Sequence, residues 1–262
     1  MLRTMEDLED YSIGATDGSI GRVKDFYFDD ERWIVRYFVV ETGAWLANRR
    51  VLISTMSIHA PNWLNRLLPV SMTRQQIEES PVIDTGRPIS RRHETSLSGH
   101  YGYPYYWRLA VLQDQVPHRP MTPAENARKA DASLAEHDDH HLRSCKTVMS
   151  SHIRAPDGDV GHVCGFLIDE ENWAIRYLIV DTRNWWLGHQ VLIAPEWIEG
   201  MSWDDHTVSV KLTLTALRNA PPYRAKTQFD RDAETKLHDH YGLPGYWAGK
   251  VKLQNSEFRY GA

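Results

Sequence analysis

Short apolar runs separated by polar turns dominate the pattern along this chain. The runs Trp33 to Glu41 and Trp173 to Asp181 are rich in β-branched and aromatic residues and too short for a buried helix, so each predicts a strand. Each follows a second predicted strand, Gly21 to Asp29 or Gly161 to Asp169, after a short acidic or polar turn. The pattern therefore predicts two antiparallel hairpins.

The strand that begins at Trp33 is apolar on both faces as far as Val40, except at Arg36. A small antiparallel sheet needs two apolar faces only if it curls around a core on one side and is covered on the other. Further strands are predicted at Thr207 to Thr213, which alternates cleanly, and less clearly at Leu67 to Thr73. We therefore predict a mainly β fold made of small antiparallel barrels with short helices.

Turn and cap residues mark the ends of these elements. Gly18 and Gly158 each follow an Asp, a pairing that favours a hairpin turn. Thr73 to Ser80 has Thr and Gln at capping-box spacing and stops before a proline, and Asp230 to His240 resembles a short helix. Gly21 and Gly161, with Gly18 and Gly158, lack the following helix and the Lys-Ser/Thr pair of a phosphate-binding loop, so hairpin geometry is the better interpretation.

An ungapped shift of 140 residues aligns the two halves of the chain. DGSIGRV, starting at Asp17, falls on DGDVGHV, starting at Asp157, and WIVRYFVVET falls on WAIRYLIVDT. About a third of the positions from 11 to 107 are identical to their counterparts, which indicates an internal duplication. We predict two tandem domains, 8–107 and 148–250, joined by a linker at 108–147.

Each copy ends in an aromatic segment, HYGYPYYW in the first and HYGLPGYW in the second. Gly and Pro fix a turn, and the rings recur at matching positions. Two roles are open: docking on a barrel or on the contact between the copies, which we favour, or binding a partner. The candidate residues are His100, Tyr101, Tyr106, Trp107, His240, Tyr241, Tyr246 and Trp247.

Arg36 and Arg176 interrupt apolar strands at equivalent positions. A buried guanidinium without a partner is costly, so each needs an acid or bound anion. We favour an internal ion pair, with Asp29 and Asp169 across the hairpin or with Glu41 and Asp181 as the acids. An anion-binding site is the alternative.

Composition narrows the function further. The chain has 262 residues, 42% of them hydrophobic, and a net charge of -5, which gives no overall attraction to nucleic acid or anionic lipid. Two cysteines, Cys145 and Cys164, are too few for a disulfide framework, and no apolar run approaches the length of a membrane span. We expect a reduced cytoplasmic protein without a transmembrane segment and without direct nucleic-acid binding.

Sites for chemistry are weakly marked. The cluster HDDHH, His137 to His141, has competent metal ligands but lies in the predicted linker, which seldom supplies fixed geometry. No nucleophile elbow, zincin motif or repeated carboxylate pair organises a catalytic centre. We therefore predict no enzyme activity, no metal and no cofactor.

The order D-G-x-x-G-x-V, an acidic turn, W-x-x-R-Y-x-x-V-[DE]-T, a Trp and V-L-I resembles the PRC-barrel domain, over roughly 8–75 and 148–215. That family includes the cytoplasmic domain of the photosynthetic reaction centre H subunit and the C-terminal domain of a ribosome maturation factor. The aromatic segments are similar to C-terminal extensions of stand-alone bacterial members. The repeat signature that carries the resemblance is Gly18, Gly21, Trp33, Arg36, Tyr37, Gly158, Gly161, Trp173, Arg176 and Tyr177.

The resemblance implies a β-barrel interaction module with no catalytic residues and a protein partner, with photosynthetic or electron-transfer membrane complexes as the leading class. It also implies a peripheral location at the inner or photosynthetic membrane. A ribosome assembly factor, marked by a local basic patch, and a metal- or small-molecule-dependent enzyme, marked by a shared polar pocket, are the alternatives. Because fusing two copies raises their effective concentration, we predict that the repeats pair as an intramolecular pseudo-dimer.

Overall fold

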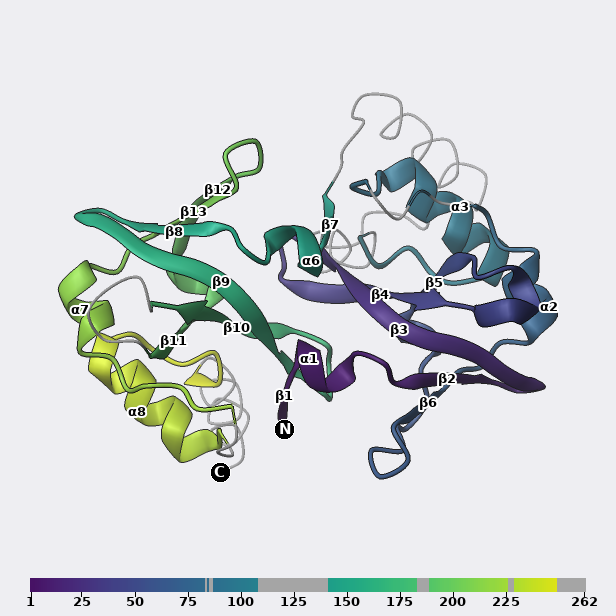
Figure 1. Ribbon diagram of the computed structural model, residues 1–262, viewed down its shortest axis with the longest axis horizontal. Helices are drawn as coiled ribbons and strands as arrows, with labels where there is room; N and C mark the ends of the chain where they lie inside the picture. The colour runs from purple at the N-terminus through teal and green to yellow at the C-terminus, as the bar shows by residue number, and fades with distance from the viewer. Residues whose placement is uncertain (83, 85–86, 108–140, 183–188, 226–228, 249–262) are drawn as a thin grey trace, which may run out of the picture. The chain divides into compact units, whose positions relative to one another are not determined.

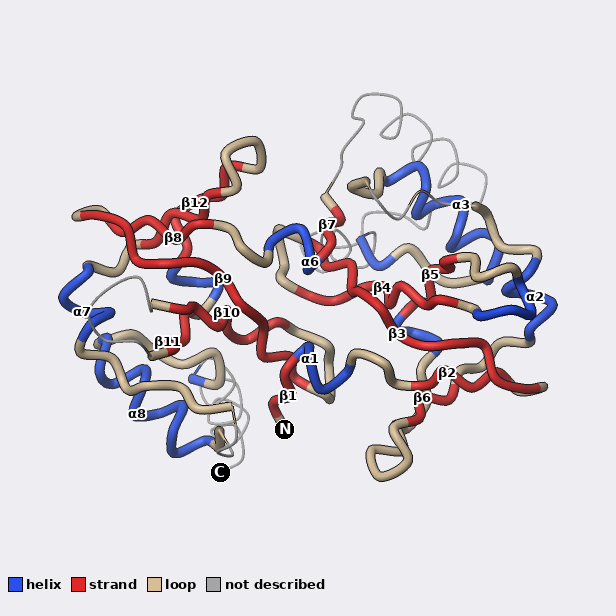
Figure 2. Tube along the Cα trace, viewed as in Figure 1, coloured by secondary structure: helices blue, strands red, loops and turns tan. Residues whose placement is uncertain are grey.

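Strands form most of the regular structure in both halves of the chain, and the helices between them are short (Figure 2). The computed structural model describes residues 1–82, 84, 87–107, 141–182, 189–225 and 229–248. Its contacts divide the chain into two compact units. We call Asp7–Thr147 the β3 unit, and Met1–Glu6 together with Val148–Ala262 the β9 unit.

The β3 unit contains a mixed sheet of six strands (Figure 1). The strand order is β5-β4-β3-β2-β6, with β7 paired to β3 off this path, and only β2 and β6 run parallel among its described strands. The strands are β2 (Ser12–Ala15), β3 (Gly18–Asp29), β4 (Ile34–Glu41), β5 (Arg50–Ser54), β6 (Leu67–Pro69) and β7 (Leu142–Ser144).

The β9 unit contains a mixed sheet of seven strands in the order β11-β10-β9-β8-β13-β12, with β1 paired to β9 off this path. Its one parallel pair among the described strands is β8 with β13. The strands are β1 (Leu2–Thr4), β8 (His152–Ala155), β9 (Gly158–Asp169), β10 (Ile175–Asp181), β11 (Gln190–Ile193), β12 (Ile198–Ser202) and β13 (Thr207–Val210).

Short helices connect or flank these strands. Each unit has one longer helix that includes the first two residues of its aromatic segment, α3 in the β3 unit and α8 in the β9 unit (Figure 1). The helices are α1 (Met5–Leu8), η1 (Gly43–Leu46), η2 (Thr55–Ser57), α2 (Arg74–Glu78), α3 (Arg91–Tyr101), α6 (Cys145–Val148), η3 (Pro195–Trp197), α7 (Leu214–Arg218) and α8 (Arg231–Tyr241).

Local sequence signals account for many of these boundaries. The predicted hairpins are confirmed as β3 with β4 and β9 with β10, and each Asp-Gly turn joins the preceding short strand to β3 or β9. The predicted capping box at the start of α2 is confirmed, because Thr73 and Gln76 bond each other's backbone N–H groups. The predicted helix near Asp230 is also confirmed as α8, which Asp230 caps through the Ala233 N–H.

The expected closed barrel is not found among the described strands. In each unit the path of paired strands ends at two different strands that are not paired with each other, so the sheet is open. Strand β4 has apolar residues on both faces because other elements of its unit pack against it. Tyr37 and Val39 of β4 pack in one core cluster with Leu97 of α3 and Leu142 of β7.

The first strand of each sequence copy belongs to the other copy's unit. Strand β1 pairs with β9, whereas β7, which begins 140 residues after β1, pairs with β3. Leu142–Ser144 falls in the predicted linker 108–147, so the predicted C-terminal boundary of the linker is wrong. The sequence did not show this strand because three residues are too few to show the period of a strand. Residues 108–140 of that prediction lie outside the described part of the chain.

Candidate functional site

The polar network of the β3 unit begins where β3 turns into β4. One carboxylate oxygen of Asp29 accepts hydrogen bonds from the backbone N–H groups of Glu31 and Arg32, both at 3.1 Å. The other lies 3.4 Å from Nη2 of Arg36, and the Asp29 side chain is almost fully buried. Turn formation and charge pairing thus use the same carboxylate.

The β9 unit repeats this pair. Nη2 and Nε of Arg176 donate to Oδ2 of Asp169 at 2.9 Å and 3.3 Å, and the Asp169 carboxylate accepts from the Glu171 N–H at 3.1 Å. The predicted ion pairs with Asp29 and Asp169 are therefore confirmed. A guanidinium in an apolar strand is tolerated because its acid lies on the partner strand of the same hairpin.

An aromatic ring covers each of these arginines. The guanidinium carbon of Arg36 lies 3.7 Å from the ring centre of Tyr106, and that of Arg176 lies 3.9 Å from Tyr246. A cation over the face of an aromatic ring is attracted by its quadrupole, and the flat guanidinium also stacks on it. The end of each aromatic segment therefore docks on the sheet of its own unit.

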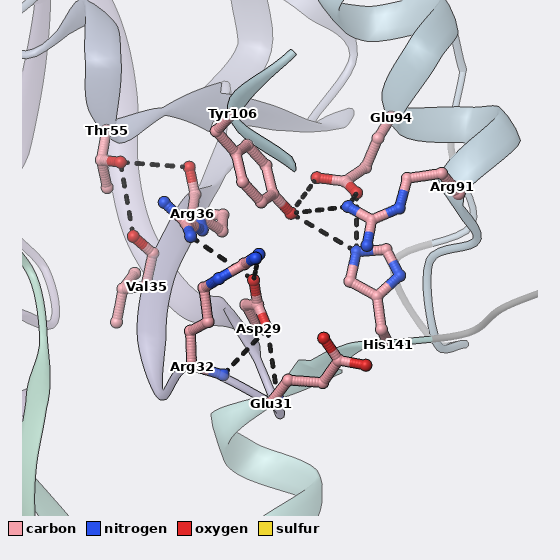
Figure 3. A network of polar contacts seen from close by, with 10 residues as sticks. All are labelled: Asp29, Glu31, Arg32, Val35, Arg36, Thr55, Arg91, Glu94, Tyr106 and His141. Carbon is pink, nitrogen blue, oxygen red and sulfur yellow. Dashed lines mark hydrogen bonds and ion pairs between the residues drawn. The ribbon is translucent and has the colours of Figure 1, made fainter. Parts of the chain in front are cut away.

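Beyond the ring of Tyr106 lies a buried acid, Glu94 of α3 (Figure 3). Tyr106 donates its hydroxyl hydrogen to Oε1 of Glu94 at 2.8 Å. Oε2 of Glu94 lies 2.7 Å from Nε2 of His141 and 3.1 Å from Nη1 of Arg91. Glu94 and His141 are both nearly inaccessible to solvent, so one carboxylate ties the helix, the aromatic segment and the residue before β7 together.

The β9 unit keeps the acid but changes its neighbours. Glu234 lies 2.9 Å from Nη1 of Arg231 and accepts from Tyr246 at 3.4 Å and from Tyr177 at 3.1 Å. The Tyr177 oxygen also lies 2.9 Å from Nε2 of His238, which occupies the position of Ser98 in the first copy. Each network therefore contains one buried histidine, supplied from different places in the chain.

Tyrosine hydroxyls in these networks stay protonated. Burial, reinforced by the carboxylate of Glu94, raises the pKa of Tyr106 and of Tyr37 well above the ordinary value. Burial and the Glu234 carboxylate raise the pKa of Tyr246 to about 12. The Tyr106 and Tyr246 hydroxyls therefore act as donors to buried acids, a structural role that requires no transfer of the proton.

The helix end within each aromatic segment is built in the same way in both units. Gly102 and Gly242 cap α3 and α8 with φ values of 70° and 65°, which a glycine adopts without strain. His100 lies with Nε2 2.7 Å from the Gln76 carbonyl oxygen, and His240 with Nε2 2.8 Å from that of Ala216. Since a carbonyl only accepts, each Nε2 carries a proton and ties its helix to the shorter one before it.

The remaining rings of the aromatic segments contact the same helices. Trp107 lies under the guanidinium of Arg91 at 4.5 Å, and Trp247 under that of Arg231 at 4.2 Å. Tyr101 packs against the core cluster of the β3 unit. The corresponding Tyr241 packs on Trp197, with ring centres 4.8 Å apart. Each of the contacts described here lies within one unit, and none of them involves a second copy of the segment.

The repeat signature occupies positions that its residue types explain. Tyr37 and Tyr177 are buried in their sheets. Trp33 and Trp173, predicted to begin the second hairpin strand, lie instead in the turn before β4 and β10, with φ values of 56° and 61°, an uncommon backbone for a large residue. Sequence reasoning missed Glu94 and Glu234 as site residues, although both recur at the 140-residue offset, each three residues before a leucine.

Two cavities flank the networks. One of about 280 Å³ in the β9 unit is lined by Asp169, Glu234 and Tyr246 among others, and one of about 20 Å³ lies beside Arg36 in the β3 unit. Within the described residues, no group of three or more His, Cys, Asp and Glu could hold a metal ion. Of the cluster HDDHH, His137–His140 lie outside the described residues, and the imidazole of His141 is engaged by Glu94.

The described helices include none that is long and apolar enough to cross a membrane. A search of protein-family models found no match for this chain. A search of curated protein sequences also found no match.

Replacing Arg36 by Ala is expected to lower the free energy of unfolding by about 2 kcal/mol, because the buried Asp29 loses a charge partner and Tyr106 its stacking partner. Lys at this position restores charge but not the planar stack, so it should fall in between. Urea denaturation measures both. Arg32→Ala is the control: Arg32 is 36% exposed, its ion pair with Asp29 is 3.5 Å long, and its loss should cost less than about 0.5 kcal/mol. Equal effects at the two positions would contradict this assignment.

Acid should weaken the β9 unit through His238. Burial lowers the pKa of His238 below its ordinary 6.5, because the charged imidazolium is disfavoured away from water. The unfolded state then binds the proton more tightly, so the contribution is full above pH 6.5 and is lost as the pH falls through the lowered pKa. Thermal unfolding at pH 7.5 and 5.5 measures the loss. His238→Ser, which copies Ser98 of the other unit, should reduce this acid sensitivity; an unchanged pH dependence would exclude His238 as its source.

Proposed function

We propose that this chain is a non-catalytic protein-docking or assembly module built from two PRC-barrel-type units. The proposal places it at the cytoplasmic face of the inner or photosynthetic membrane, bound to a photosynthetic or electron-transfer complex. The partner class rests on the resemblance of the repeat signature to the PRC-barrel family. No bound cofactor is part of the proposal.

The proposed docking role is supported by the contacts that the recurring residues make with one another. In the first copy, Arg36 stacks on Tyr106, and Tyr106 donates its hydroxyl hydrogen to Glu94. In the second copy, Arg176, Tyr246 and Glu234 make the same contacts. These residues hold a helix and an aromatic segment against a sheet, and so make the unit rigid. A unit whose shared arginine, tyrosine and glutamate side chains pair with one another is suited to presenting the rest of its surface to a macromolecule.

A candidate contact point lies at the tip of the loop between η2 and β6. Leu64 is 93% exposed there, beside Trp63, whose ring packs edge-on against Tyr11 with centres 6.1 Å apart. The matching position in the second copy is Asp204, so the two loops offer different chemistry. A large apolar residue held out by a packed aromatic base is a reasonable anchor for a protein partner.

Affinity capture of the tagged full chain from gently solubilised source cells, followed by quantitative mass spectrometry, tests the proposal. Enrichment of electron-transfer membrane proteins is the expected result. Leu64→Asp, which copies Asp204, should leave the unfolding midpoint unchanged and reduce that enrichment at least tenfold. Enrichment of ribosomal proteins would replace the proposed partner class with the assembly-factor alternative, and capture of neither class would overturn the proposal.

A further inference from the structure

The long central strand of each unit has an edge that is filled in two sections. Strand β4 covers one edge of β3 from Arg22 to Asp29. On the other edge, β2 covers Gly18 to Arg22, and β7 covers Tyr27 to Asp29. We call this last section of β3, and its counterpart Leu167–Asp169 in β9, the strand slots. An empty slot would leave backbone N–H and C=O groups unpaired at a sheet edge.

Both slots hold their strand in the same register. In the β3 unit Leu142 lies opposite Asp29 and Ser144 opposite Tyr27. In the β9 unit Leu2 lies opposite Asp169 and Thr4 opposite Leu167. Each pair of slot positions differs by 140 residues, as do the strands that fill them. The slots therefore bind the same segment, Leu-Arg-Ser or Leu-Arg-Thr, in the same way.

An ion pair identifies the central arginine of each strand. Nε of Arg143 lies 3.1 Å from Oδ2 of Asp30, and Nε of Arg3 lies 2.7 Å from Oε2 of Glu170. The acid is the residue directly after the slot in both units. Arg3 and Glu170 are about one-fifth exposed, so the charges are partly shielded from water and their signs matter for pairing.

Within this one chain, the two units exchange strands β1 and β7. Strand β1 opens the first copy but completes the β9 unit, and β7 opens the second copy but completes the β3 unit. In exchanges of this kind an identical element from another molecule makes the same contacts as the original, so the contacts themselves do not distinguish the donors. Only the covalent connection favours the strand from the same chain, by raising its effective concentration.

We infer that the strand slot of the β9 unit accepts β1 from a second copy of this chain, so that two chains trade β1 and form a dimer. The partner fits because it supplies the same Leu2, the same Arg3 and the same backbone register. This dimer is independent of the membrane partner proposed above, and its test uses the purified protein alone. The exchange competes with closure within one chain, so refolding at high concentration favours it.

Charge reversal separates the two modes of closure. One full-length variant carries Arg3→Glu, and the other carries Glu170→Arg. Alone, each brings like charges together in its own slot. Mixed, the two chains restore both ion pairs only by trading β1, since each strand then meets an opposite charge on the other chain. The variants are unfolded, mixed at about 100 μM and refolded together, and native mass spectrometry then determines the mass.

The expected result is a dimer of one chain of each kind, at least tenfold more abundant than either homodimer, with mass twice that of the 30.3 kDa chain. The double variant Arg3→Glu/Glu170→Arg is the matched control: it restores opposite charges in its own slot, so it should refold with the wild-type unfolding midpoint and the wild-type ratio of monomer to dimer. If this control folds while the mixture yields only single chains or unfolded protein, the inference is wrong.

Discussion

Gly21→Ala and Gly161→Ala are each expected to lower the free energy of unfolding by about 3 kcal/mol or more. A Cβ built on Gly21 would lie 1.9 Å from the carbonyl oxygen of Glu41, and one on Gly161 would lie 2.0 Å from that of Asp181. The obstructing atoms are backbone, so no rotamer change can relieve the overlap. Either the β3–β4 or the β9–β10 hairpin must shift, and the cost falls on the most extensive strand pairing of the unit.

Gly99→Ala is the matched control for these substitutions. Gly99 lies in α3 and is exposed, and a Cβ added to it would have no atom within 4 Å beyond its own stretch of helix. Ala in place of Gly within a helix stabilises by up to about 1 kcal/mol, so this variant should be at least as stable as the wild type. Urea denaturation followed by circular dichroism compares the three variants. Losses of less than about 1 kcal/mol at Gly21 and Gly161 would show that the strands there are not held in close approach.

The sequence predicted these glycines as part of the repeat signature but assigned them to hairpin turns. That assignment holds for Gly18 and Gly158, which open β3 and β9 directly after the turn. For Gly21 it was incomplete, because the need for glycine comes from a neighbouring strand that passes within van der Waals distance. A contact of this kind depends on the approach of two strands, and a single strand's pattern holds no information about it.

In the arginine networks too, some contacts could be predicted from the sequence and others could not. The Arg36–Asp29 pair could be predicted because both residues belong to one hairpin and a guanidinium among apolar residues needs an acid. Tyr106 and Glu94 lie far from that hairpin in sequence, and their convergence requires α3 and the aromatic segment to fold back onto β4. Recurrence was the available signal, since each of these residues has an identical counterpart 140 positions later.

The exchange of β1 and β7 had no sequence signal at all. Both strands are three residues long, too short to show a period, and their sequences differ only by Thr4 against Ser144. Closure within a copy and exchange between copies would therefore leave the same pattern. The two slots and the strands that fill them have the same register and the same central ion pair, which is why a second chain can compete for them.

Glu94→Ala is expected to lower the free energy of unfolding by about 3–4 kcal/mol. The substitution removes in one step the acceptor of the Tyr106 hydroxyl, the charge partner of Arg91 and the carboxylate that contacts the His141 imidazole. His141 is only 2% exposed and Arg91 15%, so neither can reach water without moving the chain around it. Removing the acid alone is costly because its polar partners remain buried without it.

The second copy provides a graded comparison within the same molecule. Glu234→Ala also removes a buried acid, but Arg231 is 51% exposed and can turn into solvent, so the expected loss is smaller, about 2 kcal/mol. Glu94→Gln keeps an acceptor for Tyr106 and loses only the charge, and it should fall between wild type and Glu94→Ala. Urea denaturation of the three variants gives the order. If Glu234→Ala proves as costly as Glu94→Ala, the burial of the charges around the acid does not determine the stability of the network, and its packing role must dominate instead.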